Sequence, residues 1–194
     1  KEGVNAEALQ DHILNDLATF GKNAYRLNMI TNHDRNSHDG TVFERFGAGV
    51  KAMAVFSFVS YGVPVLYSGQ EVGLNKRLKF FDRDPIDWSD PDQYFPFYKK
   101  LNEIKAENPA LWNGGYGSMP QKLYDGNLDV FSAKRVKGEN TVIAIINMSN
   151  KEQSISFKAS ETEGNYTDAF SGETLQIGDM KLAPWQYLVF IKNK

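Results

Sequence analysis

Two short apolar segments, each followed at once by polar residues, flank a longer apolar segment in the first half of the chain. Residues 25–31 (YRLNMIT) and 63–67 (VPVLY) have the length and composition of strands. Residues 42–60 between them are apolar on almost every face, which is typical of a helix enclosed by protein. Strands joined by such a helix pair in parallel, with both faces of the sheet covered. The first half is therefore predicted to be a parallel α/β fold.

Polar side chains follow both predicted strands. Asn32, His33 and Asp34 come after the first strand, and Gln70 and Glu71 come shortly after the second. The carboxyl ends of parallel strands share one edge of the sheet, where functional side chains gather. The alternative for the triplet is a solvated loop in which Asn and Asp cap a turn. Gln70 and Glu71 have two alternatives, a contact with substrate or a hydrogen-bonded role in holding the loops of this edge.

Two further helices are predicted around this unit. Residues 6–20 place apolar side chains at helical spacing, and Gly21 supplies a stop signal. An apolar stripe between residues 94 and 104 predicts a second helix, opening at Asp90-Pro91 and ending before Asn108-Pro109.

The character of the chain changes after Asn113. Short strand-like runs follow, with connections too short for crossover helices: residues 128–134, 141–147, 154–157, 166–170, 173–177 and 185–191. Antiparallel pairing in a β-sandwich is the economical arrangement, and Trp185 is expected to pack in its core. We predict two domains, an α/β segment over residues 1–113 and an antiparallel β-sandwich over residues 114–194.

Composition narrows the classes of partner. The formal net charge is −2, and the basic residues are scattered among acidic ones, so no basic stripe for nucleic acid is present. The sequence has no cysteine, which excludes disulfides and thiolate metal sites, and its histidines have no paired metal-ligand spacing. No membrane span is predicted, since Ser57, Ser60, Gly62 and Pro64 interrupt the longest apolar stretch. The first residues contain neither an initiator Met nor a signal peptide, so we expect a chain that begins partway through a gene product, and a secreted, periplasmic or cytoplasmic location stays open.

Several motifs occur in a fixed order along the chain. The segment LNMITNHDR, an apolar strand running into Asn-His-Asp, resembles the fourth signature region of the α-amylase family of glycoside hydrolases. GVPVLYSGQEVG resembles its eighth barrel strand and the following turn, KRLKFFDRDPIDW and YKKLNEIKAENPAL are similar to the last barrel helix and its approach, and LAPWQYLVFIK resembles the closing strand of its C-terminal β-sandwich. These motifs occur in order between about Tyr25 and Lys194. The resemblance implies part of a (β/α)₈ barrel, about βα7 and βα8, followed by the sandwich.

The resemblance also implies an activity. The family cleaves α-linked glucans such as starch, glycogen and maltooligosaccharides with retention, using a nucleophilic Asp, a Glu acid/base and an assisting Asp. By this resemblance Asp34 is the assisting, transition-state-stabilising carboxylate and His33 binds sugar hydroxyls. Asn32 is a weaker candidate for substrate binding, with a loop-shaping role as the alternative. Cleavage passes through an oxocarbenium-like state, so a carboxylate fixed at the ring hydroxyls can make contacts that strengthen as charge develops.

The same resemblance places the nucleophile and the acid/base before Lys1. We therefore expect a fragment that is inactive alone and that associates with the missing N-terminal barrel portion or with another copy, because a partial barrel leaves strand edges and apolar faces uncovered. No cofactor is expected in this chain, and the calcium often found in the family would lie in the missing part. The alternatives are a transglycosylating or α-1,6-cleaving relative, and a noncatalytic carbohydrate-binding protein.

One segment near this edge is open to two interpretations. Asp82, Asp84 and Asp87 are expected to form ion pairs and turns in preference to contacting outer sugars. Phe80 and Phe81 are either sugar-stacking groups or core residues, and their exposure separates these cases.

Overall fold

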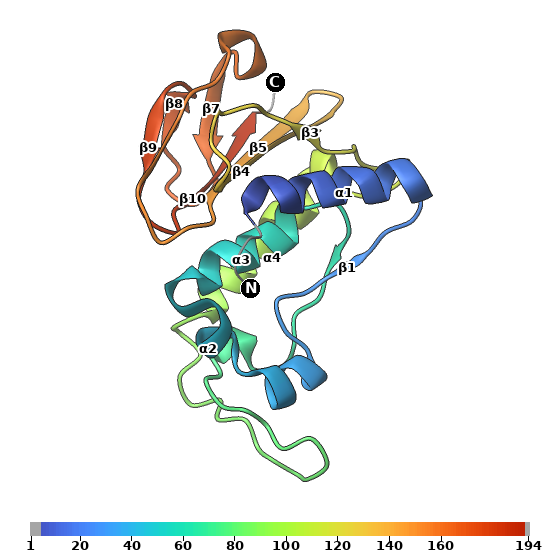
Figure 1. Cartoon of the computed structure of the whole chain (residues 1–194), viewed down its shortest axis with the longest axis vertical. Helices are drawn as coiled ribbons and strands as arrows, with labels where there is room; N and C mark the ends of the chain where they lie inside the picture. Colours follow the sequence, from blue (N-terminus) through green and yellow to red (C-terminus); the bar gives the residue numbers. More distant parts are fainter. Residues whose placement is uncertain (1–4, 193–194) are drawn as a thin grey trace.

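The computed structural model describes residues 5–192 and has three layers (Figure 1). Helices α3 and α4 pack against one face of a six-stranded sheet, and a two-stranded sheet covers its other face. A long loop, residues 73–94, extends away from the sheets at the lower end of the molecule in Figure 1.

The first section alternates helices with very short strands. Its elements are α1 (Ala6–Phe20), β1 (Leu27–Asn28), the π-helical turn η1 (Arg35–Asp39), α2 (Val42–Phe46), η2 (Gly47–Gly49), α3 (Val50–Val59), β2 (Val63–Pro64), η3 (Gln70–Val72), α4 (Phe95–Glu107) and η4 (Pro109–Leu111). β1 and β2 pair in parallel, with Leu27 opposite Val63. The predicted parallel strand–helix–strand unit is confirmed.

The strands of this unit are shorter than predicted. Val63 and Val65 donate backbone N–H groups to the carbonyls of Arg26 and Asn28, and Pro64 between them has no N–H to donate. Among residues 5–192, β1 and β2 pair only with each other, so each strand has one edge without a strand partner. Leu27 is 62% exposed and Val63 41% exposed. Regular pairing is short because this sheet lacks neighbouring strands within the described chain.

The prediction of one continuous helix over residues 42–60 is wrong, because α2, the turn η2 and α3 occupy this range. Thr41 caps α2 through a capping box with Glu44, and Gly47, with φ +53°, ends that helix. The chain passes through η2 before α3 begins. The ring of Trp185 packs over Gly49 so closely that an added Cβ would lie 2.8 Å from ring carbon Cε3. The break therefore accommodates a residue of the sandwich, and Trp185 packs against the core as expected.

Helix α4 also begins later than predicted, at Phe95 instead of Asp90. Pro96 lies in its first turn, where the missing N–H would have no intrahelical partner anyway. In contrast, α1 has the predicted bounds, with Asn5 accepting from the N–H of Ala8 at its start and Gly21 at its end.

The second section is an antiparallel sandwich. Its elements are β3 (Gln121–Lys122), β4 (Val130–Lys137), β5 (Asn140–Asn147), β6 (Gln153–Ile155), η5 (Ala159–Glu161), β7 (Asn165–Asp168), β8 (Thr174–Gln176), β9 (Met180–Leu182) and β10 (Tyr187–Lys192). The larger sheet has the order β3-β4-β5-β10-β7-β8, and β6 pairs with β9 in the smaller one. The sequence pattern missed β3 and β9, since runs of two or three residues are too short to establish a periodicity.

Strand β5 is buried along its whole length because both of its faces are covered. Val142 and Ile146 face the helices, whereas Ile143 and Ile145 face the smaller sheet. This arrangement explains why β5 reads as a continuous apolar run instead of an alternating one.

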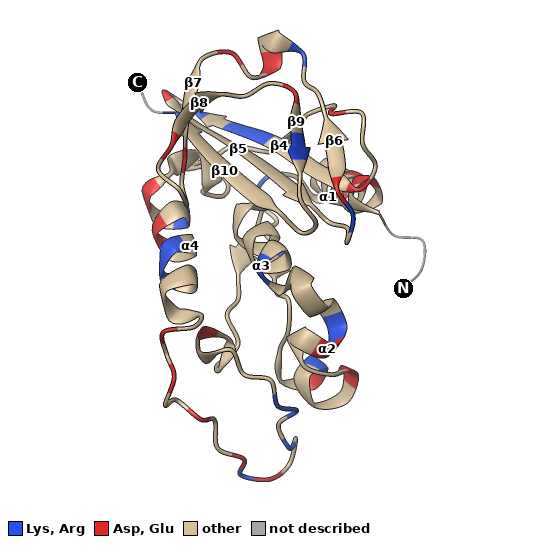
Figure 2. Cartoon of the chain, turned by 90° about the vertical axis from the view of Figure 1, so that its left-hand side faces the viewer, with Lys and Arg blue, Asp and Glu red and all other residues tan. Residues whose placement is uncertain are grey.

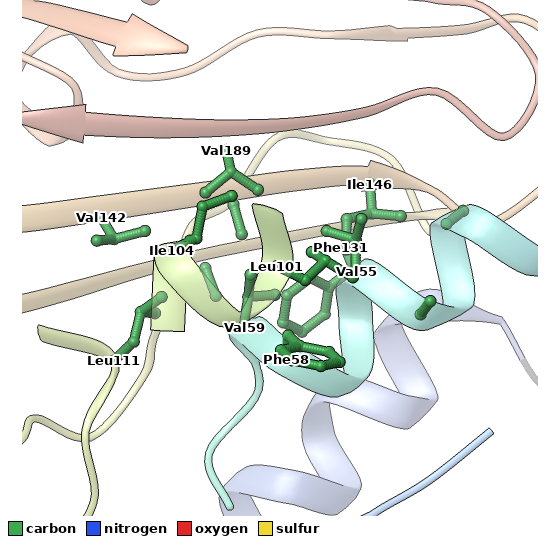
Figure 3. Close-up of a cluster of buried hydrophobic side chains, with 14 of the residues drawn as sticks. Val55, Phe58, Val59, Leu101, Ile104, Leu111, Phe131, Val142, Ile146 and Val189 are labelled. Atoms are coloured by element: carbon green, nitrogen blue, oxygen red, sulfur yellow. The ribbon is translucent and has the colours of Figure 1, made fainter. Parts of the chain in front are cut away.

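The two sections share one hydrophobic core (Figure 3). Its helical and sheet side chains include Val55, Phe58 and Val59 of α3, Leu101 and Ile104 of α4, and Phe131, Val142, Ile146 and Val189 of the larger sheet. Helix α1 is also bonded to the sandwich, since Gln10 Nε2 donates to the carbonyl of Ser132 at 2.8 Å. The division at residues 113 and 114 stays a prediction.

Candidate functional site

The Asn32–His33–Asp34 triplet lies beyond the carboxyl end of β1, where the chain enters the turn η1. Asn32 Oδ1 accepts a hydrogen bond from the Arg35 N–H at 2.8 Å, and the Asn32 carbonyl accepts from the Asn36 N–H at 2.9 Å. Asn32 therefore caps the turn, and its carboxamide oxygen is occupied by the backbone.

His33 and Asp34 are both open to solvent. Their side chains are 66% and 57% exposed, and His33 Nε2 lies 3.5 Å from Asp34 Oδ1. This distance is longer than a well-formed hydrogen bond, so both groups retain capacity for a ligand. The structure thus brings the two side chains together at the predicted edge of the sheet.

The long loop of residues 73–94 is bonded to the same turn. Asn36, which is buried, donates from Nδ2 to the Lys76 carbonyl at 3.1 Å and accepts the Leu78 N–H at 2.7 Å. Ser37 Oγ donates to the Leu78 carbonyl at 2.7 Å. Arg77 forms two hydrogen bonds with Glu44 of α2, which makes a bidentate pair. The loop is therefore held by several independent bonds.

Sequence reasoning missed Asn36, although it organises this edge. It bonds to a residue 40 positions away along the chain. An isolated asparagine in a polar cluster carries no periodic signal that would reveal such a partner.

The acidic residues of the loop have structural partners. Asp84 pairs with Lys76 and accepts the Lys79 N–H, and the Lys76 ammonium holds the pKa of Asp84 below its ordinary value. Asp82 lies 3.9 Å from Lys79 Nζ. Asp87 accepts the N–H of Ser89 at 2.9 Å. The prediction that these carboxylates serve ion pairs and turns is confirmed. Lys and Arg gather on the first arm of this loop and Asp residues mainly on its returning arm (Figure 2).

Gln70 and Glu71 hold the neighbouring loop. Buried Gln70 accepts the Tyr67 N–H at 2.8 Å and donates to the Tyr98 hydroxyl at 2.9 Å. Glu71 accepts the Gly69 N–H at 2.9 Å. Burial raises the pKa of Tyr98 to about 12, so its hydroxyl stays protonated at neutral pH. Of the two alternatives for Gln70 and Glu71, the structure favours the role in holding the loops.

A cavity of about 240 Å³ lies elsewhere, between α1, β1 and the end of α3. Its lining includes His12, Asp16, Arg26 and Ser60, and it does not include the triplet. Within residues 5–192 no group of three or more His, Cys, Asp or Glu side chains is placed to hold a metal ion. Over the same residues no helix has the length and apolar character needed to cross a membrane.

The chain is similar to curated amylases over most of its length. It is 27% identical over 177 residues to α-amylase 2 of Dictyoglomus thermophilum, covering 85% of this chain and 29% of that protein. It is 33% identical over 136 residues to a cyclomaltodextrinase of Thermoanaerobacter pseudethanolicus, covering 69% of this chain and 23% of that protein. No protein-family model matches the chain. The chain therefore spans less than a third of the length of either relative.

A solved structure shows the same fold. A noncanonic maltogenic α-amylase from Thermotoga neapolitana superposes with a TM-score of 0.79 at 14% sequence identity, covering 98% of this chain and 46% of that one. The predicted fold class, a partial (β/α)₈ barrel segment followed by an antiparallel β-sandwich, is confirmed.

The fold is that of a solved amylase, and the curated relatives are glycoside hydrolases. More narrowly, these homologues are members of the α-amylase family. The relatives of this chain are thus amylase-type glycoside hydrolases.

Proposed function

We propose that this chain contributes part of the active site of a retaining glycoside hydrolase that acts on α-glucosidic bonds in starch, glycogen or maltooligosaccharides. The observation that carries the proposal is the exposed His33–Asp34 pair at the carboxyl end of β1, in a chain whose curated homologues are members of the α-amylase family. The chemistry of the two groups supports it. Asp34 supplies a carboxylate to the sugar hydroxyls, and His33 donates to a neighbouring hydroxyl as charge develops on the ring.

The catalytic pair itself comes from outside this sequence in our proposal. A retaining mechanism needs two carboxyl groups about 5–5.5 Å apart, one as nucleophile and one as acid/base. Carboxylates near Asp34 are already engaged: Asp39 pairs with Arg35 at 2.5 Å, and Glu44 pairs with Arg77 at 2.9 Å. The chain alone is therefore expected to leave maltooligosaccharides intact.

The open faces of β1 and β2 support a second part of the proposal. Leu27, Met29 and Val63 are large apolar side chains with at least 40% exposure, and within residues 5–192 each strand has one edge without a strand partner. Such surfaces favour association with another chain or segment. We propose that further barrel strands cover it in the whole protein, and that a second copy covers it when the chain is alone.

Substitution of Asp34 tests the proposed role directly. In a protein that contains this chain together with both further carboxylates, Asp34→Asn should lower kcat by about 100- to 1,000-fold, as removal of one transition-state contact does. Because Asp34 is exposed, thermal unfolding should be unchanged. Asp179→Asn, also exposed but located between β8 and β9 of the sandwich, is the matched control. A near-normal kcat for Asp34→Asn would remove this residue from the mechanism.

Product analysis of the same protein separates the related activities. Hydrolysis, transglycosylation and cleavage of α-1,6 links give different products from maltoheptaose and pullulan. If a protein with both further carboxylates binds these glucans without changing them, the noncatalytic alternative replaces the enzyme.

A further inference from the structure

Two adjacent phenylalanines lie beside the candidate site. Phe81 is 92% exposed and Phe80 is 40% exposed, so neither is a core residue. Their rings meet edge to face with centroids 4.8 Å apart. Of the two interpretations left open by the sequence, core packing is thus excluded for Phe81.

Phe80 connects this aromatic pair with the triplet. Its ring centroid lies 5.7 Å from that of His33 and 4.9 Å from that of His38. The imidazole of His33 is therefore in contact with the aromatic pair on one side and within 3.5 Å of Asp34 on the other. A single exposed aromatic side chain is ordinary, but exposed rings in contact with the candidate polar site call for an explanation.

The backbone on both sides of this pair is fixed. Leu78, two residues before Phe80, is bonded to Asn36 and Ser37 of the turn. Asp84, three residues after Phe81, is bonded to Lys76 and to the Lys79 N–H. A held loop presents Phe81 without the entropy cost of ordering a free one, which favours binding.

The polar groups around the pair fit a neutral sugar. Lys79 and Asp82 flank the two rings, are 68% and 71% exposed, and carry opposite charges. A pyranose ring has an apolar C–H face that packs on an aromatic ring and hydroxyls at its rim that bond to such groups. The opposite charges give no preference for an anion, so a phosphate or nucleotide fits less well.

We propose that Phe80 and Phe81 form a stacking subsite for a glucose unit next to the one held at His33 and Asp34, with Phe81 providing the face and Phe80 supporting it. This proposal rests on the proposed function, since it extends the same α-glucan site. It predicts that the chain recognises oligosaccharide length and not a single sugar.

The test is a binding titration of the 194-residue chain with glucose, maltotriose and maltoheptaose, followed by NMR. Phe81→Ala should weaken maltoheptaose binding about five- to tenfold, in the range expected for the loss of one aromatic face, while leaving glucose unchanged. Phe81→Trp should retain the affinity. Tyr116→Ala is the matched control, because Tyr116 is 78% exposed and lies outside this loop.

The outcomes separate the two proposals. If maltoheptaose binding is weakened by Asp34→Asn but stays within twofold after Phe81→Ala, the subsite is overturned and the proposed function stands. If Tyr116→Ala weakens binding as much as Phe81→Ala, the subsite is also overturned. If the unaltered chain binds none of the three sugars, both the subsite and this chain's share of the glucan site are overturned.

Discussion

Replacing Lys105 by methionine should change how stability depends on pH. Lys105 lies on α4, and its Nζ donates to the Gly62 carbonyl at 3.2 Å. Burial, followed by the charge of Arg135, lowers the pKa of Lys105 from 10.5 to about 7. Arg135 is itself buried and donates to the carbonyls of Trp112 and Ser118 at 2.5 and 2.6 Å. Two cations therefore lie together where the helices meet the sandwich.

The direction of the pH dependence follows from how many protons the folded and the unfolded chain bind. Below about pH 7 Lys105 is charged in both the folded and the unfolded chain, so the full cost of burying the charge is present. Between about pH 7 and 10.5 the unfolded chain binds one more proton than the folded chain, so the free energy of unfolding rises with pH. At about 1.4 kcal/mol for each pH unit between the two pKa values, the ceiling is roughly 5 kcal/mol. Because the Lys105 side chain keeps some contact with solvent, which screens its charge, we expect a stabilisation of about half of that ceiling.

Urea unfolding at pH 6 and pH 9 measures this effect. From pH 6 to pH 9 the unaltered chain should gain about 1.4 kcal/mol more than Lys105→Met, because only the two pH units above pH 7 contribute and half of their ceiling is expected. Lys99→Met, at an exposed position on the same helix, should retain the pH dependence of the unaltered chain. Equal pH dependence in the unaltered chain and in Lys105→Met would refute the reasoning.

Two further substitutions test the junction and the open face. Gly49→Ala places a Cβ 2.8 Å from the Trp185 ring and should lower the free energy of unfolding by about 1–3 kcal/mol in the same urea assay. Gly115→Ala is the control, because nothing lies within 4 Å of its added Cβ, and it should change this free energy by less than about 0.5 kcal/mol. In light scattering the chain should have a mass above its 21.9 kDa monomer, and Leu27→Ser should shift it toward the monomer while Leu128→Ser should not. A monomer with cooperative unfolding would contradict the association.

Sequence patterns predicted the helices and strands whose ends are set by neighbouring residues in the chain. Helix α1 has its expected bounds because its apolar face, cap and stop all lie within residues 5–21. The break before α3 has a local signal in Gly47 and Gly49, which the apolar pattern of residues 42–60 masks, but the packing of Trp185 over Gly49 comes from the far end of the chain and required the folded structure. Strands β1 and β2 have the right place and direction, but their length depends on neighbours that the pattern does not show.

The candidate site divides in the same way. The triplet could be placed at the edge of the sheet because a strand pattern ends immediately before Asn32. The exposure of Phe81 could not be predicted, since an aromatic residue in a loop is as compatible with burial as with solvent. The anchoring role of Asn36 depends on a loop distant in sequence, so it too required the folded structure.

The sandwich takes part in positioning the site, although it lies at the opposite end of the molecule (Figure 1). Trp185 packs over Gly49 at the junction of α2 and α3, and this contact sets where α2 can lie. Glu44 of α2 in turn holds Arg77 of the loop that carries Phe81. Contacts thus run from the sandwich through α2 to the loop that carries the aromatic pair. We therefore expect substitutions at the Trp185–Gly49 contact to change the orientation of this loop as well as the stability of the junction.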